Sequence, residues 1–410
     1  MNENEFAARV AALGGQLYVV GGWVRDRLIG RPAEDKDYVV CGLDAQTLER
    51  EFQVRSVGRQ FPVYLLEVSG RLSEVALART ERKTGTGYRG FEARFSPETT
   101  IEEDLYRRDT RMNSMAVRLP GGELIDPFGG RGDIKNKIIR ATSEHFRDDP
   151  VRALRAARQS AQLGFSIDPG TVELMSACRG ELAREPAERV FAEMRRALAS
   201  PRPEFFFTAL RDAGILDAVF PELAALIGVE QPALYHRGLD AFEHSMEVLR
   251  RAAALTPRAA TRFAALVHDL GKELTPRQEW PRHIGHEERG LAALERLDRR
   301  MTLPRPWYHF ARFMIANHMR LPRLRRPGAI VAVIGEMRRG GFDAAEVSAV
   351  IRADHGALPD FLQRYGRYAA VLDEERARLA FPADLPPQAR GRWLRMRLAE
   401  ALARRLPPEG

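Results

Sequence analysis

The stretch LYVVGGWVRDRLIGRPAEDKDYVV, residues 17–40, decides the fold of the first part of the chain. Its opening apolar run predicts a buried strand that stops at Gly21 and Gly22, and the residues after the glycines predict a short helix. A second apolar run, YVV, follows directly after two acids and predicts the next strand. The stretch has two interpretations: a phosphate site with its metal ligands, or an ordinary strand, turn, helix and strand whose charges face water.

The composition describes a folded protein with more than one hydrophobic core. With 410 residues, of which 44% are hydrophobic and 29% charged, the chain predicts two to four domains. It shows no apolar run long enough to cross a bilayer and no signal-peptide pattern, so we expect no membrane association and a cytoplasmic location. Cys41 and Cys178 are too few for a disulfide framework or a cysteine metal cluster. The net charge of +8 favours a polyanionic partner, with nucleic acid as the first candidate.

Strand and helix patterns divide the chain into a mixed head and a helical body. The head alternates short Val-, Leu- and Tyr-rich runs with Gly-rich turns and short helical patterns, whereas the chain after about residue 148 has helical spacing almost throughout. We therefore expect an α+β fold, with a small mixed sheet and helices in the head. The expected parts are a head, a helical neck, a third all-helical domain and a helical tail, over residues 1–140, 141–230, 231–345 and 346–410.

Two acids in the head predict a magnesium site. In a strand, residues two apart point to the same side, so Asp35 and Asp37 would present both carboxylates to one face and Lys36 would point to the other. Mg²⁺ takes one or two carboxylates and shares its other positions with water and substrate phosphates. Glu74, in a strand-like run nearby, is the candidate third acid. An Asp-x-Asp pair is more often plain surface charge, so the pair alone does not decide.

The glycine turn predicts a triphosphate site. Gly22 lets backbone N–H groups approach phosphate oxygens at the start of the helix, and Arg25 lies one turn further on, within reach of them. Val24 and Leu28 are one helical turn apart and should both face the core. Trp23 would then point toward a neighbouring helix or loop, away from the phosphates.

The segment YRRDTRMNSMA, residues 106–116, predicts a polar stripe. Asp109, Asn113 and Ala116 have helical spacing, and Arg108 lies beside them. Such a stripe suits a ribose and a phosphate. The alternative is a solvent-facing helix start, which fits Asp109 better than Asn113 because asparagine is a weak helix former.

A third cluster lies in FRDDPVRALRAAR, residues 146–158. Asp149 is expected to cap a helix whose first residue is Pro150. Arg152, Arg155 and Arg158 recur every three residues along that helix. The segment is either a capped basic helix that binds an RNA backbone, or a helix in which Asp149 and Arg152 offer an acceptor and a donor to the edge of a nucleobase.

Histidines concentrate in the helical body, where eight of the nine follow residue 235. One of them, His268, is followed by Asp269 in the apolar segment FAALVHDLGK. Imidazoles with a carboxylate suit a divalent transition metal such as Ni²⁺, Mn²⁺ or Zn²⁺, which lowers the pKa of bound water. The expected ligands are His244, His268, Asp269 and His318; His283 and His286 are further candidates for metal or phosphate, and Asp354 is a more distant candidate for a last acid.

The ordered motifs GGWVRD, EDKDYVV, ARTERKTGTGYRGF, RRDTRMNSMA, DPFGG and DDPVRALRAAR resemble the bacterial tRNA nucleotidyltransferases, the CCA-adding enzymes of class II in the polymerase-β-like superfamily. The resemblance implies that Asp35 and Asp37 hold Mg²⁺, with Glu74 less securely matched. It implies that residues 80–95 are a flexible loop near the phosphates. It also implies contacts with ATP or CTP from Gly22, Arg25, Arg108, Asp109, Asp149, Arg152, Arg155 and Arg158.

The segment HDLGK resembles the HD phosphohydrolase superfamily, and a class II head followed by an HD domain resembles the multifunctional CCA proteins of proteobacteria. This implies two activities: addition of CCA to tRNA 3′ ends from CTP and ATP, and hydrolysis of 2′,3′-cyclic phosphates, 2′-nucleotides and phosphate esters. It implies His268 and Asp269 as catalytic residues of the second site, with Ni²⁺ as the expected metal. We expect a monomer or a homodimer.

Three alternatives compete with this interpretation. A bacterial poly(A) polymerase shares the head motifs, but it would more often have a long basic tail and no intact HD constellation. Enzymes that make and degrade guanosine tetraphosphate have their HD domain before the synthetase, the reverse of the order here. An RNA-binding protein with an inactive head would have lost its acids, yet Asp35 and Asp37 are present. The basic segment 390–410 is either an RNA-facing helix or a packing helix.

Overall fold

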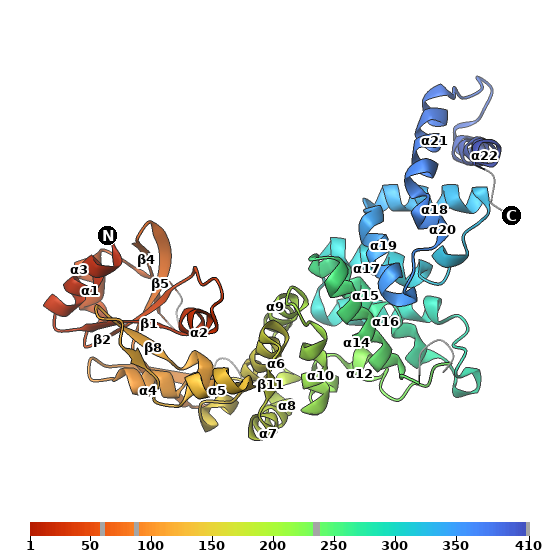
Figure 1. Cartoon of the computed structure of the whole chain (residues 1–410). Coiled ribbons are helices and arrows are strands. Elements are labelled where there is room, and N and C mark those ends of the chain that lie inside the picture. Colours follow the sequence, from red (N-terminus) through yellow and green to blue (C-terminus); the bar gives the residue numbers. More distant parts are fainter. Residues whose placement is uncertain (58–61, 86–89, 233–237, 407–410) are drawn as a thin grey trace. The chain divides into compact units, whose positions relative to one another are not determined.

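The computed structural model describes residues 1–57, 62–85, 90–232 and 238–406. The chain folds as two compact units, Met1–Val219 and Phe220–Gly410, and each is described by itself. Figure 1 shows strands only in the first part of the chain and helices through the remainder. The expected α+β head followed by a helical body is confirmed.

A seven-stranded mixed sheet forms the head, in the order β3-β4-β5-β2-β1-β8-β9. β2 and β5 run parallel, and the other neighbouring pairs are antiparallel. The strands are β1 (Gln16–Val20), β2 (Asp37–Cys41), β3 (Ser56–Val57), β4 (Val63–Val68), β5 (Arg71–Leu77), β8 (Ala116–Leu119) and β9 (Leu124–Ile125).

Both faces of the sheet are buried, which explains why its central strands are continuous apolar runs. Leu17 and Val19 of β1 belong to a core that also includes residues of α1 (Glu3–Ala12) and α3 (Ala45–Phe52). Tyr18 and Val20 belong to a second core with α4 (Ile101–Tyr106). Asp37 and Val39 are two apart on β2, so strand alternation puts Asp37 on the same side as this second core.

The glycine turn and the short helix lie where the sequence predicts them. Gly21 has φ +74° and ψ −134°, a conformation that glycine alone adopts without strain, and α2 (Gly22–Ile29) follows. Trp23 packs against the first core and under Lys36, whose Nζ lies 4.7 Å from the ring centroid, as expected. Val24 is buried, but Leu28 is 42% exposed. The prediction for Leu28 was wrong because this two-turn helix extends beyond the core at its last turn.

Two local predictions in the head were wrong. Residues 80–95, expected as a flexible loop, are largely a hairpin, in which β6 (Arg79–Lys83) pairs with β7 (Phe91–Phe95), separate from β5, which ends at Leu77. The loop at its tip, including Arg89, lies partly outside the described residues. The polar stripe is not a helix: only a 3₁₀ turn, η1 (Arg111–Asn113), forms, and Ala116 already belongs to β8.

Helices complete the first unit, with breaks near residues 164–170 and 200–203. A two-residue parallel pair, β10 (Ile138–Ile139) with β11 (Ser166–Ile167), is the exception to a wholly helical neck. The helices are α5 (Gly130–Asn136), η2 (Glu144–Asp148), α6 (Val151–Leu163), α7 (Pro169–Ala177), α8 (Arg179–Leu182), α9 (Ala187–Leu198), α10 (Glu204–Asp212) and α11 (Leu216–Val219).

The described part of the second unit is helical. Its elements are α12 (Pro221–Ala224), α14 (Ala241–Leu255), α15 (Ala259–Val267), η3 (Leu270–Leu274), η4 (Arg277–Glu279), α16 (His286–Met301), α17 (Arg305–Asn317), η5 (Leu321–Arg323), α18 (Pro327–Gly340), α19 (Ala344–His355), α20 (Asp360–Gln363), α21 (Tyr365–Arg378) and α22 (Pro387–Arg405). None of the helices in the described residues is long and apolar enough to cross a membrane. The tail helix α22 packs on α18 and α21, and the subdivision into four parts stays a prediction.

Candidate active sites

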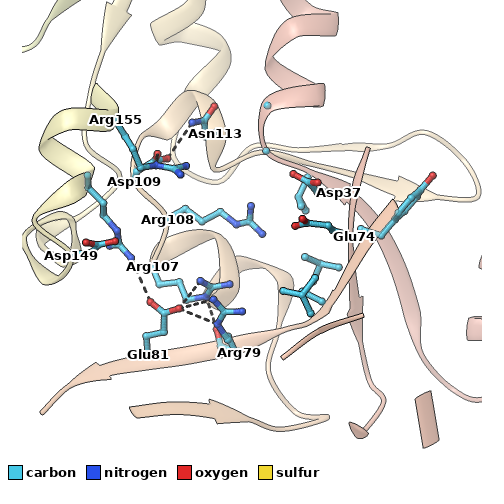
Figure 2. Close-up of a pocket in the computed structure, with 18 residues that line it drawn as sticks. Asp37, Glu74, Arg79, Glu81, Arg107, Arg108, Asp109, Asn113, Asp149 and Arg155 are labelled. Carbon is cyan, nitrogen blue, oxygen red and sulfur yellow. Dashed lines mark hydrogen bonds and ion pairs between the residues drawn. The ribbon is translucent and has the colours of Figure 1, made fainter. Parts of the chain in front are cut away.

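A polar cavity of about 440 Å³ opens between the sheet of the head and the first helices of the neck (Figure 2). This volume is within the usual range for small-molecule sites. Its polar lining combines the glycine turn, three strand carboxylates, the arginine-rich segment of the head and residues from the neck. These residues are Gly21, Gly22, Asp37, Glu74, Arg79, Glu81, Arg107, Arg108, Asp109, Asn113, Asp149, Arg152 and Arg155.

Asp37 and Glu74 lie beside each other at one side of this cavity (Figure 2). β2 and β5 are parallel neighbours with Tyr38 opposite Val75, so the residues just before them are neighbours too. Asp37 is accessible to solvent from the cavity, yet the surrounding protein desolvates it and raises its pKa; the nearby carboxylates of Glu74 and Asp35 raise the pKa further, against the effect of Arg108. A bound divalent cation would relieve this repulsion.

Asp35 is not held by the strand, contrary to the expectation. β2 begins at Asp37, and Asp35 is exposed in the irregular segment before it and does not line the cavity. Strand alternation therefore fixes the direction of Asp37 but not that of Asp35. Lys36 does point away, toward Glu3, with its Nζ 2.6 Å from a carboxylate oxygen.

Arg108 reaches across the cavity toward Asp37 and Glu74 (Figure 2). Its Nη2 atom lies 2.9 Å from Oδ2 of Asp104, a carboxyl on α4 that is fully buried. Arg107 binds the other oxygen of Asp104 at 2.5 Å. Burial opposes the charge on Asp104, but Arg107 and Arg108 hold its pKa well below the usual range. Asp104 thus fixes the direction of Arg108.

Asp109 and Asn113 come together through the 3₁₀ turn. Asn113 Nδ2 donates to Asp109 Oδ1 at 3.2 Å, and Arg155 Nε donates to Asp109 Oδ2 at 2.7 Å. Burial opposes the charge of Asp109, but Arg155 and Asn113 hold the pKa of this carboxyl well below its usual range. Arg25 joins the same hydrogen-bond network through Asn113. It donates to Asn113 at 2.9 Å, pairs with Asp26 at 2.8 Å and does not line the cavity.

The neck helix contributes Arg152 and Arg155 to the cavity, but not Arg158. Arg158 instead pairs with Glu193 of α9 at 2.5 Å, because a three-residue spacing advances by only about 300° around a helix. Three arginines at this spacing therefore do not all lie on the same face of α6. The expected cap was wrong by one residue: α6 begins at Val151 with Pro150 in the N-cap position, and Asp149, just before the cap, accepts from the N–H of Val151 at 3.1 Å.

Several residues at this cavity were not foreseen. Glu81 receives Arg107 at 2.8 Å, Arg79 at 2.9 Å and Arg152 at 3.4 Å, so it links the hairpin, α4 and the neck (Figure 2). The arginine doublet and the alternation in ARTER were the available signals for this network. Asp104 had a weaker signal, since it lies four residues before Arg108, at the spacing of a helical ion pair.

A second site lies in the other unit, where four histidines surround one carboxyl. Oδ2 of Asp269 lies 3.1 Å from Nε2 of His268 and 3.6 Å from Nε2 of His244. Its Oδ1 lies 3.3 Å from Nε2 of His286 and 3.4 Å from Nε2 of His318. All five side chains are buried. The structure thus brings the four expected ligands together, and adds His286.

The backbone fixes which nitrogen faces the carboxyl. In His268, His286 and His318, Nδ1 lies 2.8, 2.9 and 3.0 Å from the carbonyl oxygen three residues earlier. A carbonyl only accepts, so each Nδ1 carries the hydrogen and each neutral ring turns a lone pair of Nε2 into the cluster. The Nε2 atoms of His286 and His318 are only 3.1 Å apart. Two lone pairs that face each other at this distance repel, and a cation bound between them would remove the repulsion.

The donor set therefore fits a divalent metal. Two groups, His244 with His268 and Asp269, and Asp269 with His286 and His318, each have ligand atoms within 4.8 Å of one another. Buried atoms Nε2 of His268 and Oδ1 of Asp269 make no hydrogen bond within the described residues. Burial opposes a proton on His268, but the carboxylates of Asp269 and Asp354 raise its pKa to about 10, so a proton and a metal would compete here.

The surroundings of the cluster separate the remaining candidates. Asp354 joins it, with Oδ1 3.1 Å from Nε2 of His244. His283 does not: its Nδ1 bonds Thr275 Oγ1 at 2.6 Å and its Nε2 bonds the Glu230 carbonyl at 2.7 Å, so it is a structural residue in this arrangement.

Two residues of HDLGK support the cluster from one side. Nζ of Lys272 lies 2.6 Å from Oδ2 of Asp269 and adds a positive charge beside that carboxylate. At Gly271 a Cβ would collide with the backbone of His286 and Gly290, so only glycine lets α16 approach this closely. The glycine therefore sets the position of His286 relative to Asp269.

Protein-family comparisons match each of these parts. A model described as the poly A polymerase head domain matches residues 17–140, and one described as a probable RNA and SrmB-binding site of polymerase A matches residues 164–227. The HD domain model matches residues 241–357. The cavity carboxylates Asp37 and Glu74 lie in the first match, and the histidine cluster lies in the last.

Solved structures share the fold. A Bacillus stearothermophilus CCA-adding enzyme in complex with CTP is 25% identical, with a TM-score of 0.63 over 98% of this chain and 93% of that one. A CCA-adding enzyme with ATP has a TM-score of 0.66 at 20% identity, over 97% of this chain and 88% of the other, and supports the fold alone.

Similar curated proteins cover most of the chain. The multifunctional CCA protein of Pseudomonas fluorescens is 47% identical over 91% of this chain and 88% of its own length. That of Nitrosococcus oceani is 44% identical over 78% of this chain and 79% of its own. With a polymerase-type head, a neck and an HD domain in this order, the chain belongs to the family of multifunctional CCA proteins.

Proposed function

We propose that the head adds C, C and A to the 3′ end of tRNA from CTP and ATP, without a template and with release of pyrophosphate. The observation that supports this most is the cavity in which Arg108, held by Asp104, faces Asp37 and Glu74. It combines a cation for phosphate with carboxylates for metal, the two elements that nucleotidyl transfer requires.

Each part of the cavity has a role in this proposal. Asp37 and Glu74, with Asp35 from the preceding segment, would hold Mg²⁺, which when bound supplies charge neutralisation at the attacking hydroxyl and the phosphates. Gly22 opens the turn to the triphosphate, and Arg108 binds its oxygens. Asp109 and the arginine that holds it, Arg155, form the side wall for the ribose.

Asp149 and Arg152 are proposed to read the base edge. Asp149 already receives Arg189 through both carboxylate oxygens, at 3.1 and 2.8 Å. A base that donates to Asp149 therefore either displaces Arg189 or shares the carboxylate with it. Arg189 is thus proposed to take part in base recognition. Arg25 and Arg158 act from behind the cavity, through Asn113 and Glu193.

Sequencing the product of a tRNA that lacks its CCA end tests the proposal directly. The purified chain with CTP, ATP and Mg²⁺ should add three residues and stop. Long A tails, or A added where no C precedes it, would instead favour poly(A) polymerase activity. The relatives named as multifunctional CCA proteins, at 44–47% identity, argue against that alternative.

For the second site we propose metal-dependent hydrolysis of 2′,3′-cyclic phosphates, 2′-nucleotides and phosphate esters at RNA 3′ ends. His244, His268, Asp269 and His318, with His286 and Asp354, would hold the metal, for which Ni²⁺ is the proposed ion. When bound, the metal supplies an activated water near neutral pH. Lys272 keeps Asp269 charged.

Metal analysis of the purified protein, together with phosphodiesterase assays after chelation and re-addition of Ni²⁺, Mn²⁺, Zn²⁺ or Mg²⁺, tests this second proposal. Recovery with Mg²⁺ alone would contradict the choice of a transition metal. A cytoplasmic location and a monomer or homodimer are also proposed; fractionation and light scattering would test them.

A further inference from the structure

Four exposed arginines follow directly after the last histidine of the metal cluster. They lie on and around η5, between α17 and α18, and are Arg320, Arg323, Arg325 and Arg326, here called the arginine loop. Together with Glu287 and Met319 they line a surface hollow.

Within the described residues, the arginine loop has no acidic partners. None of its members has a carboxylate within 4.0 Å in that part of the chain, and the sequence carries no acid from residue 301 to residue 335. Some other arginines of this unit do pair closely: Arg296, Arg300 and Arg338 have carboxylates at 2.8, 2.6 and 2.7 Å. Four arginines and one glutamate leave the lining of the hollow with a net charge of +3, which favours a ligand with several negative charges.

The hollow lies next to the metal cluster. Its lining residues Glu287 and Met319 are the immediate chain neighbours of His286 and His318, whose Nε2 atoms are 3.1 Å apart. Glu287 is the one acid in this lining; its carboxylate lies 3.6 Å from Nδ1 of His286, and it offsets only one of the four positive charges. A ligand in the hollow therefore has one end beside the proposed hydrolytic site.

We propose that the arginine loop binds the phosphodiester backbone of an RNA strand whose 3′-terminal phosphate enters the metal cluster. This inference rests on the proposed hydrolytic function and specifies its substrate as an oligonucleotide end in preference to a free nucleotide. Guanidinium groups bind phosphates bidentately, and a row of them spaced along a loop suits a repeating backbone charge. The described lining of the hollow includes no aromatic side chain, so the contact is electrostatic and tolerant of sequence.

The test compares two substrates on the full-length protein. One is a five-nucleotide RNA that ends in a 2′,3′-cyclic phosphate, and the other is a 2′,3′-cyclic mononucleotide. The variant R323A/R326A should raise the KM for the oligonucleotide about tenfold and leave the KM for the mononucleotide unchanged. The slope of log KM against log salt for the oligonucleotide should fall by about 1.4, or about 0.7 for each phosphate that the variant no longer neutralises.

A matched control removes two other exposed arginines, Arg312 and Arg339, which lie outside the hollow in the same unit. The variant R312A/R339A carries the same net charge and should retain the wild-type KM and slope. R323K/R326K should retain most of the salt slope, because the charge is kept.

The outcomes separate the two proposals. No hydrolysis of the mononucleotide by the wild type would overturn the hydrolytic activity and this inference with it. Hydrolysis of both substrates with no change in oligonucleotide KM in R323A/R326A, or an equal change in R312A/R339A, would overturn the arginine loop alone. Competition by a glutamate-rich peptide as strong as that by RNA of equal charge would also overturn it, in favour of an acidic protein.

Discussion

The two sites of this chain handle charge in opposite ways. The head cavity keeps Asp37 and Glu74 at one side and its arginines, with the acids that pair with them, at the other, with open space between the two sides (Figure 2). In the histidine cluster the groups meet directly: four buried imidazoles lie around the buried Asp269, and the less buried Asp354 lies 3.1 Å from His244. Separated charges leave room for a triphosphate whose oxygens share the metal, whereas a close set of imidazoles and carboxylates suits a metal held mainly by the protein.

The groups that orient the functional side chains also differ between the two sites. In the head, buried ion pairs such as that of Asp104 with Arg108 fix the direction of side chains whose ends are left for a ligand. In the second unit, backbone carbonyls fix the ring nitrogens, and Gly271 allows α16 to approach. We therefore expect that damage to one site leaves the other active, since each support lies within its own compact unit.

The largest expected effect comes from D37A, with D35A tested beside it. Loss of a metal-binding carboxylate should remove several kcal/mol of transition-state stabilisation, which lowers CCA addition by about 10³-fold or more, while phosphodiesterase activity persists. Single-turnover addition to a tRNA without CCA measures it. E34A removes an exposed carboxylate one residue before Asp35 and should leave the rate unchanged. Full addition by D37A with Mg²⁺ would contradict the role of Asp37.

The reverse experiment is H268A or D269A. Either change should lower metal content and reduce cyclic phosphodiesterase activity by about 10²–10³-fold, because both residues meet at the cluster centre and a metal supplies several kcal/mol. CCA addition should persist. H309A, which removes an exposed histidine outside the cluster, serves as control. If both activities fell in a folded D269A protein, the separation of the two sites would be wrong.

A smaller effect is expected from D104N, which removes the charge that holds Arg107 and Arg108. Loss of one partner in a buried pair should cost about 3 kcal/mol of unfolding free energy. The KM for ATP and CTP should rise, since Arg108 loses its fixed direction. Denaturant unfolding and initial rates measure the two effects.

The pH dependence of D104N follows from the sign of the pKa shift. The folded-state pKa of Asp104 lies well below its ordinary value of 3.8, so its ion pairs stabilise the protein above that pH and are lost as the pH falls below it. The difference in unfolding free energy between wild type and D104N should therefore be constant at neutral pH and shrink in acid. A difference that grew as pH fell would contradict this role.

The smallest effect is expected from G271A. The added Cβ would collide with backbone atoms of His286 and Gly290, so the second unit should lose about 1–3 kcal/mol of stability. G366A, in the first turn of α21 with no atom within 4 Å of the new Cβ, should be neutral or stabilising by up to about 1 kcal/mol. Calorimetry would measure the change in stability, and assays of both activities would show which site is affected. Equal melting temperatures of G271A and the wild type would show that α16 shifts to accommodate the added methyl group at little cost.

The sequence by itself determined the elements whose signal is local. An apolar run closed by Gly21 predicts a strand and a turn because only glycine adopts that backbone conformation freely. His268 and Asp269, directly after an apolar helical run, predict a metal site because buried imidazoles beside an acid need a cation. The order of head and HD motifs determined the family.

Tertiary structure alone decided which side chains meet. Arg25 and Arg158 have the same local spacing as residues of the cavity, yet Asn113 and Glu193 draw them away from it. His286 joins the cluster and His283 does not, although they are three residues apart. Local spacing fixes the face of a helix or strand, but the partner across the gap comes from a distant segment, and its charge decides where a long side chain settles.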